Sequence, residues 1–413
     1  MPTLNVTVAY QVDSAHSGRA SFGQSITFPS APAWSIDFGN EIAYPLVAED
    51  KVFVLTKGAV PGSNPAYGGS LLYALDVNTG APVWGPIGIQ SSLFPVSQHA
   101  YDRGRIFVMN YDGKLRAFDS STGALLWTDE LAGTELKDQS VGDTPELANV
   151  NSYFFTAPPT ATKGLVYVSG AGFGGILFAI DGATGNVIWK APVQEGEHSS
   201  AAVSNEGVFV SYPCNVQKRD PATGVLQWYY YGPCFGGGGR TPVYADGRLY
   251  VRDWAMPLAA PGLIFDTTTG EHIGYFPTRA SATPIPTAPM PAIGQTMGYF
   301  VYGSPTGCCT AGTGTILAGI DLNGGAPTWQ FIGDGNIAMA PLLIDDYVFA
   351  ASQSGKVYAL SAQSGALAWT GEAGSTLFGT DEHDAAMLTG MAVGSGHLVV
   401  PAGNRITAWR MVP

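Results

Sequence analysis

The sequence is poor in charge, and basic residues are especially scarce. Charged side chains make up 12% of the 413 residues, and only 19 are Lys or Arg, which leaves a net charge of −13. A nucleic-acid binder needs Lys and Arg to displace the counterions of phosphates, and an anionic membrane surface attracts the same residues. The few scattered cations therefore argue against both kinds of partner.

Several other signals are missing. No apolar run reaches the roughly 18–20 residues that span a bilayer, so we expect no transmembrane segment. The opening stretch, MPTLNVTVAYQVDSAHSG, lacks the basic and apolar regions of a signal peptide, and we expect Met1 to begin an excised mature domain. There is no CxxC pair, HExxH, Ser-His-Asp order or dinucleotide fingerprint, so no common zinc or hydrolase motif points to an activity.

Cysteine is rare, but its number is even. The four residues are Cys214, Cys234, Cys308 and Cys309. They allow two disulfides, Cys214–Cys234 and a vicinal Cys308–Cys309, and the alternative is four free thiols. Low Lys content and loops rich in Gly, Asn and Thr favour the oxidised form, and with it an extracytoplasmic location: secreted, periplasmic or at the cell surface.

What the chain has in abundance is glycine, proline and a repeated pattern. Its 54 Gly and 29 Pro residues suggest many short strands joined by turns. The repeat reads apolar strand, turn, V-x-V strand, loop, L-x-A-x-D strand, x-x-T-G turn, and a strand ending in Trp. Clear copies are LLYALDVNTGAPVW, KLRAFDSSTGALLW, ILFAIDGATGNVIW and KVYALSAQSGALAW. Weaker copies are VQKRDPATGVLQW, LAGIDLNGGAPTW and LIFDTTTGEHIGYF, with Gly274 in the Trp position.

An eighth copy is divided between the chain ends. ITAWRMV supplies a third strand with Trp409 in the Asp position, and SAPAWSIDF supplies the missing fourth strand with Trp34. Joining them removes an open sheet edge. The sequence therefore predicts an all-β fold, a single eight-bladed β-propeller of four-stranded antiparallel blades over residues 25–413. Residues 1–24 are expected to be a lead-in segment packed on it.

Each residue type of the repeat has a physical role. The Asp carboxylate caps backbone N–H groups of the hairpin turn, and the Gly adopts the positive φ that the turn requires. The Trp fills the wedge between neighbouring blades, where its indole N–H can find an acceptor.

These repeats resemble the tryptophan-docking units of the PQQ-like repeat family. That family includes quinoprotein alcohol dehydrogenases and cofactor-free outer-membrane assembly lipoproteins, and the resemblance runs from about residue 10 to the end. The dehydrogenase resemblance implies a vicinal disulfide against the quinone, a Trp platform, a calcium set and an Asp base. Cys308–Cys309 matches the first; candidates for the others are Trp254, Asn151, Glu146, Asp253 and Asp384. A structural loop staple is the alternative role for the cysteine pair.

Long insertions are expected on one face only, because turns such as AEDK and YDRG on the other face are short. The long loops are 56–70, 129–152, 229–239, 253–262 and 303–315, and the cysteines lie among them. Aromatic residues gather in or near the same loops: Tyr67, Tyr153, Phe154, Tyr212, Tyr229, Tyr230, Tyr231, Phe235 and Trp254. This elaborated face is the predicted binding face.

Two acidic clusters with histidine are candidate chemistry at the channel mouth. Asp381, Glu382, His383 and Asp384 precede the inner strand of blade 8, and Glu195, Glu197 and His198 occupy the equivalent place in blade 4. They can bind a cation or act as acid and base, with His383, Asp384 and His198 as catalytic candidates. Blades 4 and 8 are opposite, so we expect the clusters to be too far apart to share one metal ion. A solvated rim is the alternative interpretation.

Arg240 follows a run of four glycines and can clamp a carboxylate or sulfate. The one-sided insertions, the aromatic residues and the absence of an assembled catalytic set favour a non-catalytic binding propeller that is secreted or at the cell surface. We expect it to be a monomer and assign it no cofactor, with PQQ and calcium as the alternative. It would bind a polymer such as a glycan, or a protein, through Arg240, Trp254, Tyr231, Phe235 and Tyr153. The alternatives are a PQQ- and calcium-dependent alcohol dehydrogenase of the polyvinyl-alcohol type, and a polysaccharide lyase or hydrolase.

Overall fold

The computed structural model describes most of the chain. The described residues are 5–66, 68–91, 97–111, 113–131, 155–172, 174–194, 196, 198–212, 215–232, 241–252, 262–276, 285–286, 289–303, 315–325, 327–379, 382 and 387–412. Within them the regular structure is strand only, and the strands form eight sheets. No helix among these residues is long and apolar enough to cross a membrane.

The first four blades follow one another along the chain. Blade 1 contains β3 (Leu46–Ala48), β4 (Lys51–Gly58), β5 (Gly69–Asp76) and β6 (Pro82–Ile89). Blade 2 contains β7 (Ser97–Asp102), β8 (Arg105–Asn110), β9 (Lys114–Asp119) and β10 (Leu125–Glu130). Blade 3 contains β11 (Thr160–Thr162), β12 (Leu165–Gly172), β13 (Gly174–Asp181) and β14 (Val187–Val193). Blade 4 contains β15 (Ala202–Val203), β16 (Val208–Tyr212), β17 (Asn215–Arg219) and β18 (Leu226–Tyr231).

The other four blades complete the ring. Blade 5 contains β19 (Val243–Ala245), β20 (Arg248–Val251), β21 (Leu263–Asp266) and β22 (His272–Tyr275). Blade 6 contains β23 (Ile285–Pro286), β24 (Ala292–Ile293), β25 (Met297–Gly303), β26 (Ile316–Asp321) and β27 (Pro327–Phe331). Blade 7 contains β28 (Leu342–Ile344), β29 (Tyr347–Ala351), β30 (Lys356–Ser361) and β31 (Leu367–Glu372), with β1 (Arg19–Ala20) parallel to β28. Blade 8 contains β32 (Ala392–Gly394), β33 (His397–Ala402), β34 (Arg405–Arg410) and β2 (Trp34–Asp37).

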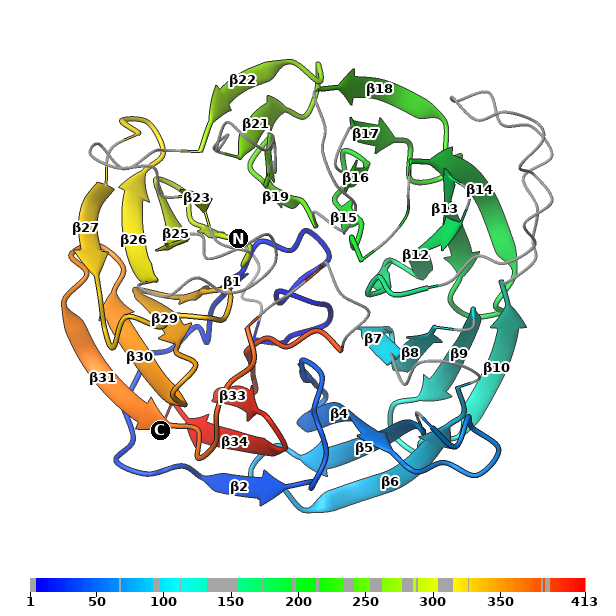
Figure 1. The fold of residues 1–413 in the computed structure, drawn as a ribbon, viewed down its shortest axis with the longest axis horizontal. Helices are drawn as coiled ribbons and strands as arrows, with labels where there is room; N and C mark the ends of the chain where they lie inside the picture. The colour runs from blue at the N-terminus through cyan, green and yellow to red at the C-terminus, as the bar shows by residue number, and fades with distance from the viewer. Residues whose placement is uncertain are drawn as a thin grey trace.

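The ring closes within blade 8. Strand β2 pairs antiparallel with β34, and Trp34 lies opposite Ala408. Figure 1 shows the blades around a common centre, with β2 on the outer rim beside β34. The predicted eight-bladed propeller, completed by an N-terminal strand, is therefore confirmed.

The repeat residues hold the turns together. Asp76 Oδ1 accepts hydrogen bonds from the Thr79 N–H at 2.9 Å and from its hydroxyl at 2.8 Å, and the following Gly80 has a φ of 73°. Asp119, Asp181, Asp220 and Asp266 accept the same bonds in their blades. The capping N–H groups and hydroxyls lower the pKa of Asp76.

The repeat tryptophans link each blade to the next. Trp84 of blade 1 donates its indole N–H to Ser120 O of blade 2 at 3.0 Å, and its ring lies against Gly123. The same bond runs from Trp127 to Gly182 O, from Trp189 to Pro221 O, from Trp228 to Thr267 O and from Trp329 to Ala362 O. Blade 5 has Gly274 instead, and the Gly325 turn of blade 6 accordingly has open space around it.

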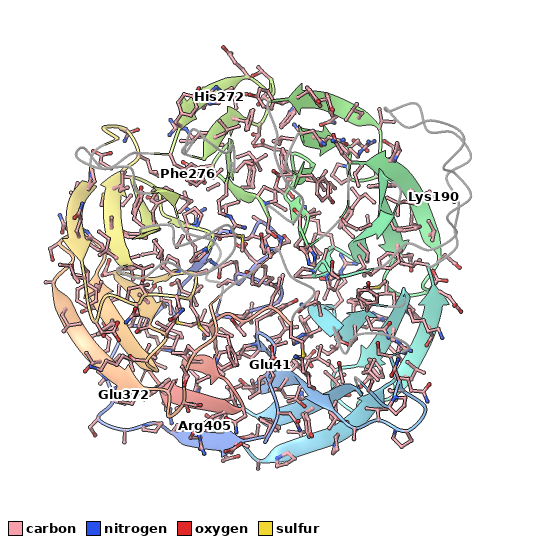
Figure 2. All side chains as sticks on the ribbon, in the orientation of Figure 1. Glu41, Lys190, His272, Phe276, Glu372 and Arg405 are labelled. Atoms are coloured by element: carbon pink, nitrogen blue, oxygen red, sulfur yellow. The ribbon has the colours of Figure 1, made fainter. Side chains whose placement is uncertain are left out.

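Burial follows strand position within a blade. The second strands are buried on both faces, as the all-buried β16 shows, because neighbouring blades cover them. The outermost strands β10, β18 and β31 alternate between exposed and half-buried residues. In Figure 2 Lys190, Glu372 and Arg405 lie near the rim, whereas the buried Phe276 lies further inside the ring.

Candidate functional site

The lead-in segment closes one end of the central channel. Thr7 contacts blade 1 through Val47 O at 2.8 Å and blade 8 through Val393 O at 2.8 Å. Further along, five carbonyls of the segment each accept a backbone N–H from a different blade. The pairs are Val8 with Tyr101 of blade 2, Ser14 with Val203 of blade 4, Ala15 with Tyr244 of blade 5, Ser17 with Ile293 of blade 6 and Gly18 with Leu343 of blade 7. These donors lie near the ends of the inner strands, beside the turns to the second strands. The blue N-terminal segment accordingly occupies the middle of the ring in Figure 1.

A buried ion pair lies nearer the other end of the channel. Arg252 follows β20 of blade 5, and Glu382 precedes the inner strand of blade 8, yet the Arg252 Nη2 and Glu382 Oε2 atoms are in contact. Their side chains are 10% and 2% exposed. Glu382 Oε2 also accepts the Thr241 N–H at 3.0 Å. Glu382 thus contacts blade 5 although it lies just before the first strand of blade 8 in sequence.

The pair is incompletely satisfied within the described part of the chain. Glu382 Oε1 and Arg252 Nε are buried and have no hydrogen-bond partner there. Ser97 Oγ, His99 Nδ1, Ser199 Oγ and Gln11 Oε1 share this state, and Ser97, His99 and Ser199 lie at or before the inner strands. Since buried polar groups are normally hydrogen-bonded, the two open atoms of the ion pair mark a place suited to a polar ligand or water.

Hydrogen bonds connect the ion pair to the lead-in segment. Thr241 Oγ1 accepts the Ser200 N–H at 3.0 Å, and the Ser200 and Thr160 hydroxyls are 2.8 Å apart. Thr160 Oγ1 lies 3.3 Å from His16 Nε2, and His16 Nδ1 lies 2.6 Å from Tyr10 O. Burial lowers the pKa of His16, so its imidazole is neutral near pH 7. This network links Thr241, which is bonded to Glu382, to His16 of the lead-in segment.

Sequence reasoning missed a histidine that is buried between blades 1 and 2. His99 of β7 is fully buried and stacks on Tyr44, with ring centroids 5.0 Å apart. The Tyr44 hydroxyl donates to His99 O at 2.5 Å. Burial lowers the pKa of His99 to about 3. The available signal was the run of polar residues Ser97, Gln98 and His99 in an inner strand whose first four residues are all buried.

The structure places the predicted site residues at different locations. Glu382 belongs to the ion pair, and the buried His198 donates its N–H to Thr156 Oγ1 at 3.2 Å. Tyr231 is 66% exposed on the outermost strand β18, stacked with Tyr229, so the structure places it on the rim and not in the channel. These candidates lie outside the described residues: Tyr67, Glu146, Asn151, Tyr153, Phe154, Glu195, Glu197, Cys214, Cys234, Phe235, Arg240, Asp253, Trp254, Cys308, Cys309, Asp381, His383 and Asp384.

Most members of the two acidic clusters lie outside the described residues, so their separation stays a prediction. The described members are His198 and Glu382, and Glu382 is joined to Ser200 of blade 4 through Thr241. Among the described residues no group of three His, Cys, Asp or Glu side chains is placed to hold a metal ion. The sharing of a metal between these clusters stays untested.

A family model described as outer membrane protein assembly factor BamB matches residues 26–146, 68–233, 174–331 and 312–411. Among curated proteins, the dehydrogenase subunit of a quinone alcohol dehydrogenase from Komagataeibacter europaeus is 28% identical over 183 residues, 41% of this chain and 23% of that protein. Quinoprotein ethanol dehydrogenase of Pseudomonas aeruginosa is 28% identical over 223 residues, 50% of this chain and 32% of its own length. The chain thus matches well under two thirds of these relatives.

Solved structures show the same fold. Quinohemoprotein alcohol dehydrogenase from Comamonas testosteroni has a TM-score of 0.64 at 14% identity, covering 98% of this chain and 80% of the other. BamB from Moraxella catarrhalis has a TM-score of 0.59 at 17% identity, with 93% and 99% covered. The curated relatives overturn our prediction of a non-catalytic binding propeller, because they favour the quinone-dependent dehydrogenase that was its alternative. None of the relatives named here degrades a polysaccharide.

Proposed function

The chain belongs to the PQQ-like repeat family of the BamB type, and from that membership and its curated relatives we propose that it is a PQQ-dependent dehydrogenase that oxidises an alcohol. The support from relatives is the match to quinone-linked alcohol dehydrogenases over 41% and 50% of the chain. The observation that carries the proposal is the buried, partly unsatisfied Arg252–Glu382 pair in a channel with one closed end.

The residues of the channel fit a quinone that bears carboxylates. A guanidinium matches a carboxylate in geometry and charge, and Arg252 still has a buried Nε–H without a partner among the described residues. The Ser199 hydroxyl, next in sequence to the Ser200 that is bonded to Thr241, is a further buried group able to donate to ligand oxygens. Arg252 is therefore the residue that would hold a carboxylate of the cofactor.

PQQ, when bound, supplies a two-electron acceptor for the oxidation of an alcohol. The chain supplies the proton chemistry and the exclusion of water. Glu382 Oε1 is a buried carboxylate oxygen with no partner among the described residues, so it can accept the alcohol proton. Arg252, on the other oxygen, keeps the carboxylate oriented. The lead-in segment blocks water from the far end of the channel.

Calcium is the metal we propose beside the quinone, with ligands other than Glu382, which is the base. Calcium takes roughly six to eight oxygen ligands, so several groups must supply them. Asp381 and Asp384 are sequence neighbours of Glu382 and are proposed as two of these ligands. The vicinal Cys308–Cys309 disulfide and the Trp254 platform stay predictions of the same cofactor site.

Location and partners follow from the same comparison. We propose an extracytoplasmic location, since the family description names an outer-membrane assembly factor. That description also supports a protein as the class of macromolecular partner. Cell fractionation with an antibody to the chain tests the location, and recovery with the cytosolic fraction contradicts it.

The function is tested by reconstitution. The protein is incubated with PQQ and calcium and dialysed, then assayed for quinone absorbance and for dye reduction with a series of primary and secondary alcohols. Arg252→Met is expected to lose retained quinone, and Glu382→Gln to reduce kcat more than quinone retention. Arg248→Met, at the opposite end of β20, is the matched control. No quinone retained by the wild-type protein, and no dye reduction, contradicts the proposal.

A further inference from the structure

Glutamates fill the groove between blades at two places on the closed face of the ring. Glu49, in the turn between β3 and β4, accepts bonds from the Tyr101 hydroxyl at 2.8 Å and the Ser120 hydroxyl at 2.6 Å of blade 2. Glu206 of blade 4 accepts from the hydroxyls of Tyr244 at 2.7 Å and Thr267 at 2.6 Å of blade 5. In both grooves a glutamate of one blade is hydrogen-bonded to two hydroxyl groups of the next blade.

The groove between blades 2 and 3 lacks all three of these groups. Arg103 stands where blade 1 has Glu49, since both come first in a two-residue turn, with φ of 49° and 52°. Ala161 takes the strand position of Tyr101, because Ala161 pairs with Val166 as Tyr101 pairs with Ile106. Gly182 follows the turn Asp181 as Ser120 follows Asp119. This groove therefore has a guanidinium at the position of the carboxylate and no hydroxyl at either of the other two positions.

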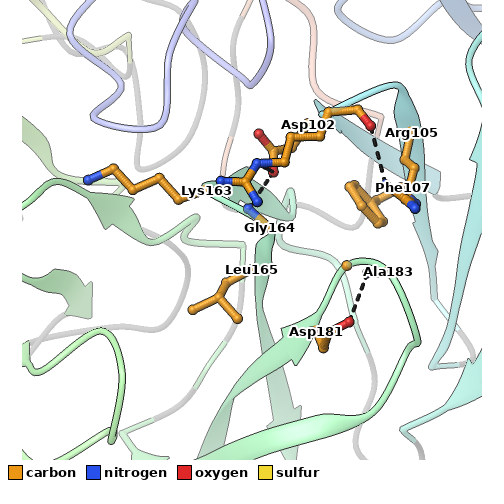
Figure 3. A pocket seen from close by; sticks show the side chains of 10 residues that line it. Asp102, Arg105, Phe107, Lys163, Gly164, Leu165, Asp181 and Ala183 are labelled. Carbon is orange, nitrogen blue, oxygen red and sulfur yellow. Dashed lines mark hydrogen bonds and ion pairs between the residues drawn. The ribbon is translucent and has the colours of Figure 1, made fainter.

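A cavity of about 200 Å³ occupies this groove, lined by Arg103, Arg105, Lys163 and Phe107 among others. A Cβ on Gly182 would lie 3.0 Å from the Phe107 ring and 3.1 Å from Gly164 O, so a side chain there would require these neighbours to shift. Figure 3 shows Arg105 and Phe107 on one side of the cavity, with the Lys163 ammonium pointing away from them. The Lys163 ammonium donates to Asn205, so the guanidinium groups of Arg103 and Arg105 are the cationic donors left to the cavity.

The arginines have N–H groups available, while each nearby carboxylate accepts hydrogen bonds from backbone N–H groups. Arg105 Nη1 donates to Arg103 O at 3.2 Å, and its buried Nε has no partner among the described residues. Asp102 Oδ2 accepts the Gly164 N–H at 2.6 Å and lies 3.9 Å from Arg103 Nε. Asp181 Oδ1 accepts the Ala183 and Thr184 N–H groups of its own turn, at 2.9 and 2.8 Å. The Arg105 Nε–H is therefore an open hydrogen-bond donor of a residue that lines the cavity.

We propose that this cavity binds a small oxyanion: sulfate, phosphate or a short carboxylate. The neighbouring glutamate-filled groove shows that this position between blades accommodates a carboxylate. Two arginines in one cavity are notable in a chain with 19 basic residues and a net charge of −13. The volume lies below the roughly 300–1,000 Å³ of pockets for larger organic ligands. The site is on the closed face, so it is independent of the quinone site.

Isothermal titration calorimetry tests the proposal, with sodium sulfate, phosphate and acetate titrated separately against a chloride background of constant ionic strength. Arg103→Glu places in blade 2 the residue that blade 1 has, and it is expected to weaken oxyanion binding at least about tenfold, as loss of a charge-assisted contact does. Arg105→Gln is expected to have a similar effect. Lys51→Gln is the matched control, because Lys51 has the turn position of Arg105 beside the filled groove.

The three anions distinguish the ligand class. Tighter binding of sulfate and phosphate than of acetate assigns the site to tetrahedral oxyanions, and the reverse assigns it to carboxylates. Circular dichroism and the melting temperature establish that each variant is folded. Wild-type protein that binds none of the three anions above chloride, or folded Arg103→Glu and Arg105→Gln that bind them unchanged, overturns the proposal.

Discussion

Removing Glu382 is the sharpest test of the channel's construction. Its side chain is 2% exposed, its partner Arg252 is 10% exposed, and one oxygen also accepts the Thr241 N–H. Glu382→Leu leaves a buried guanidinium without a countercharge. Breaking a buried pair in this way costs about 3–5 kcal/mol, whereas replacing both partners by apolar residues is often close to neutral. We therefore expect a loss of about 3–5 kcal/mol for Glu382→Leu and a much smaller loss for Glu382→Leu with Arg252→Met.

The measurement is urea unfolding at pH 7, followed by tryptophan fluorescence and circular dichroism. The four proteins of the cycle are wild type, each single variant and the double variant. Glu382→Gln is an additional variant, because its amide keeps an acceptor for Thr241 while removing the charge. A loss below about 1 kcal/mol for Glu382→Leu, or a double variant as unstable as the sum of the singles, would refute the reasoning.

Three further predictions concern the fold. The unfolded chain protonates His99 near pH 6.5 and the native state only near pH 3, so its contribution to stability is complete above pH 6.5 and declines as the pH falls. The decline is about 1.4 kcal/mol per pH unit between these values, and urea unfolding of His99→Phe should show a shallower loss. Gly123→Ala should reduce the free energy of unfolding by about 1–3 kcal/mol more than Gly325→Ala does. The reason is that a Cβ on Gly123 would lie 2.9 Å from Trp84, whereas a Cβ on Gly325 would have no atom within 4 Å. Equal melting temperatures of the two variants contradict the docking role of Trp84. Trp34→Ala should cost about 3–5 kcal/mol in urea unfolding, since Trp34 is 8% exposed and donates to Val77 O at 2.8 Å; a loss no larger than that of the exposed Leu125→Ala contradicts closure through β2.

The blade architecture could be predicted from the sequence because its determinants are local and repeated. An Asp three residues before a Thr caps its own turn, and a Gly after it takes the positive φ, whatever the rest of the ring does. A Trp four residues after that Gly reaches the next blade, and Gly274 in this position leaves Gly325 uncovered. The divided repeat likewise indicated the pairing of Trp34 with the strand of Ala408.

The channel could not be predicted in the same way. Glu382 lies 130 residues from Arg252 in sequence, and their contact joins blade 5 to the segment that precedes the first strand of blade 8. The path of the lead-in segment across the inner strands, the stacking of His99 on Tyr44 and the rim position of Tyr231 have no counterpart in the repeat. A periodic pattern encodes which residues face a neighbouring blade. The axis is where eight different strand ends meet, so the polar groups that converge there depend on the closed ring itself.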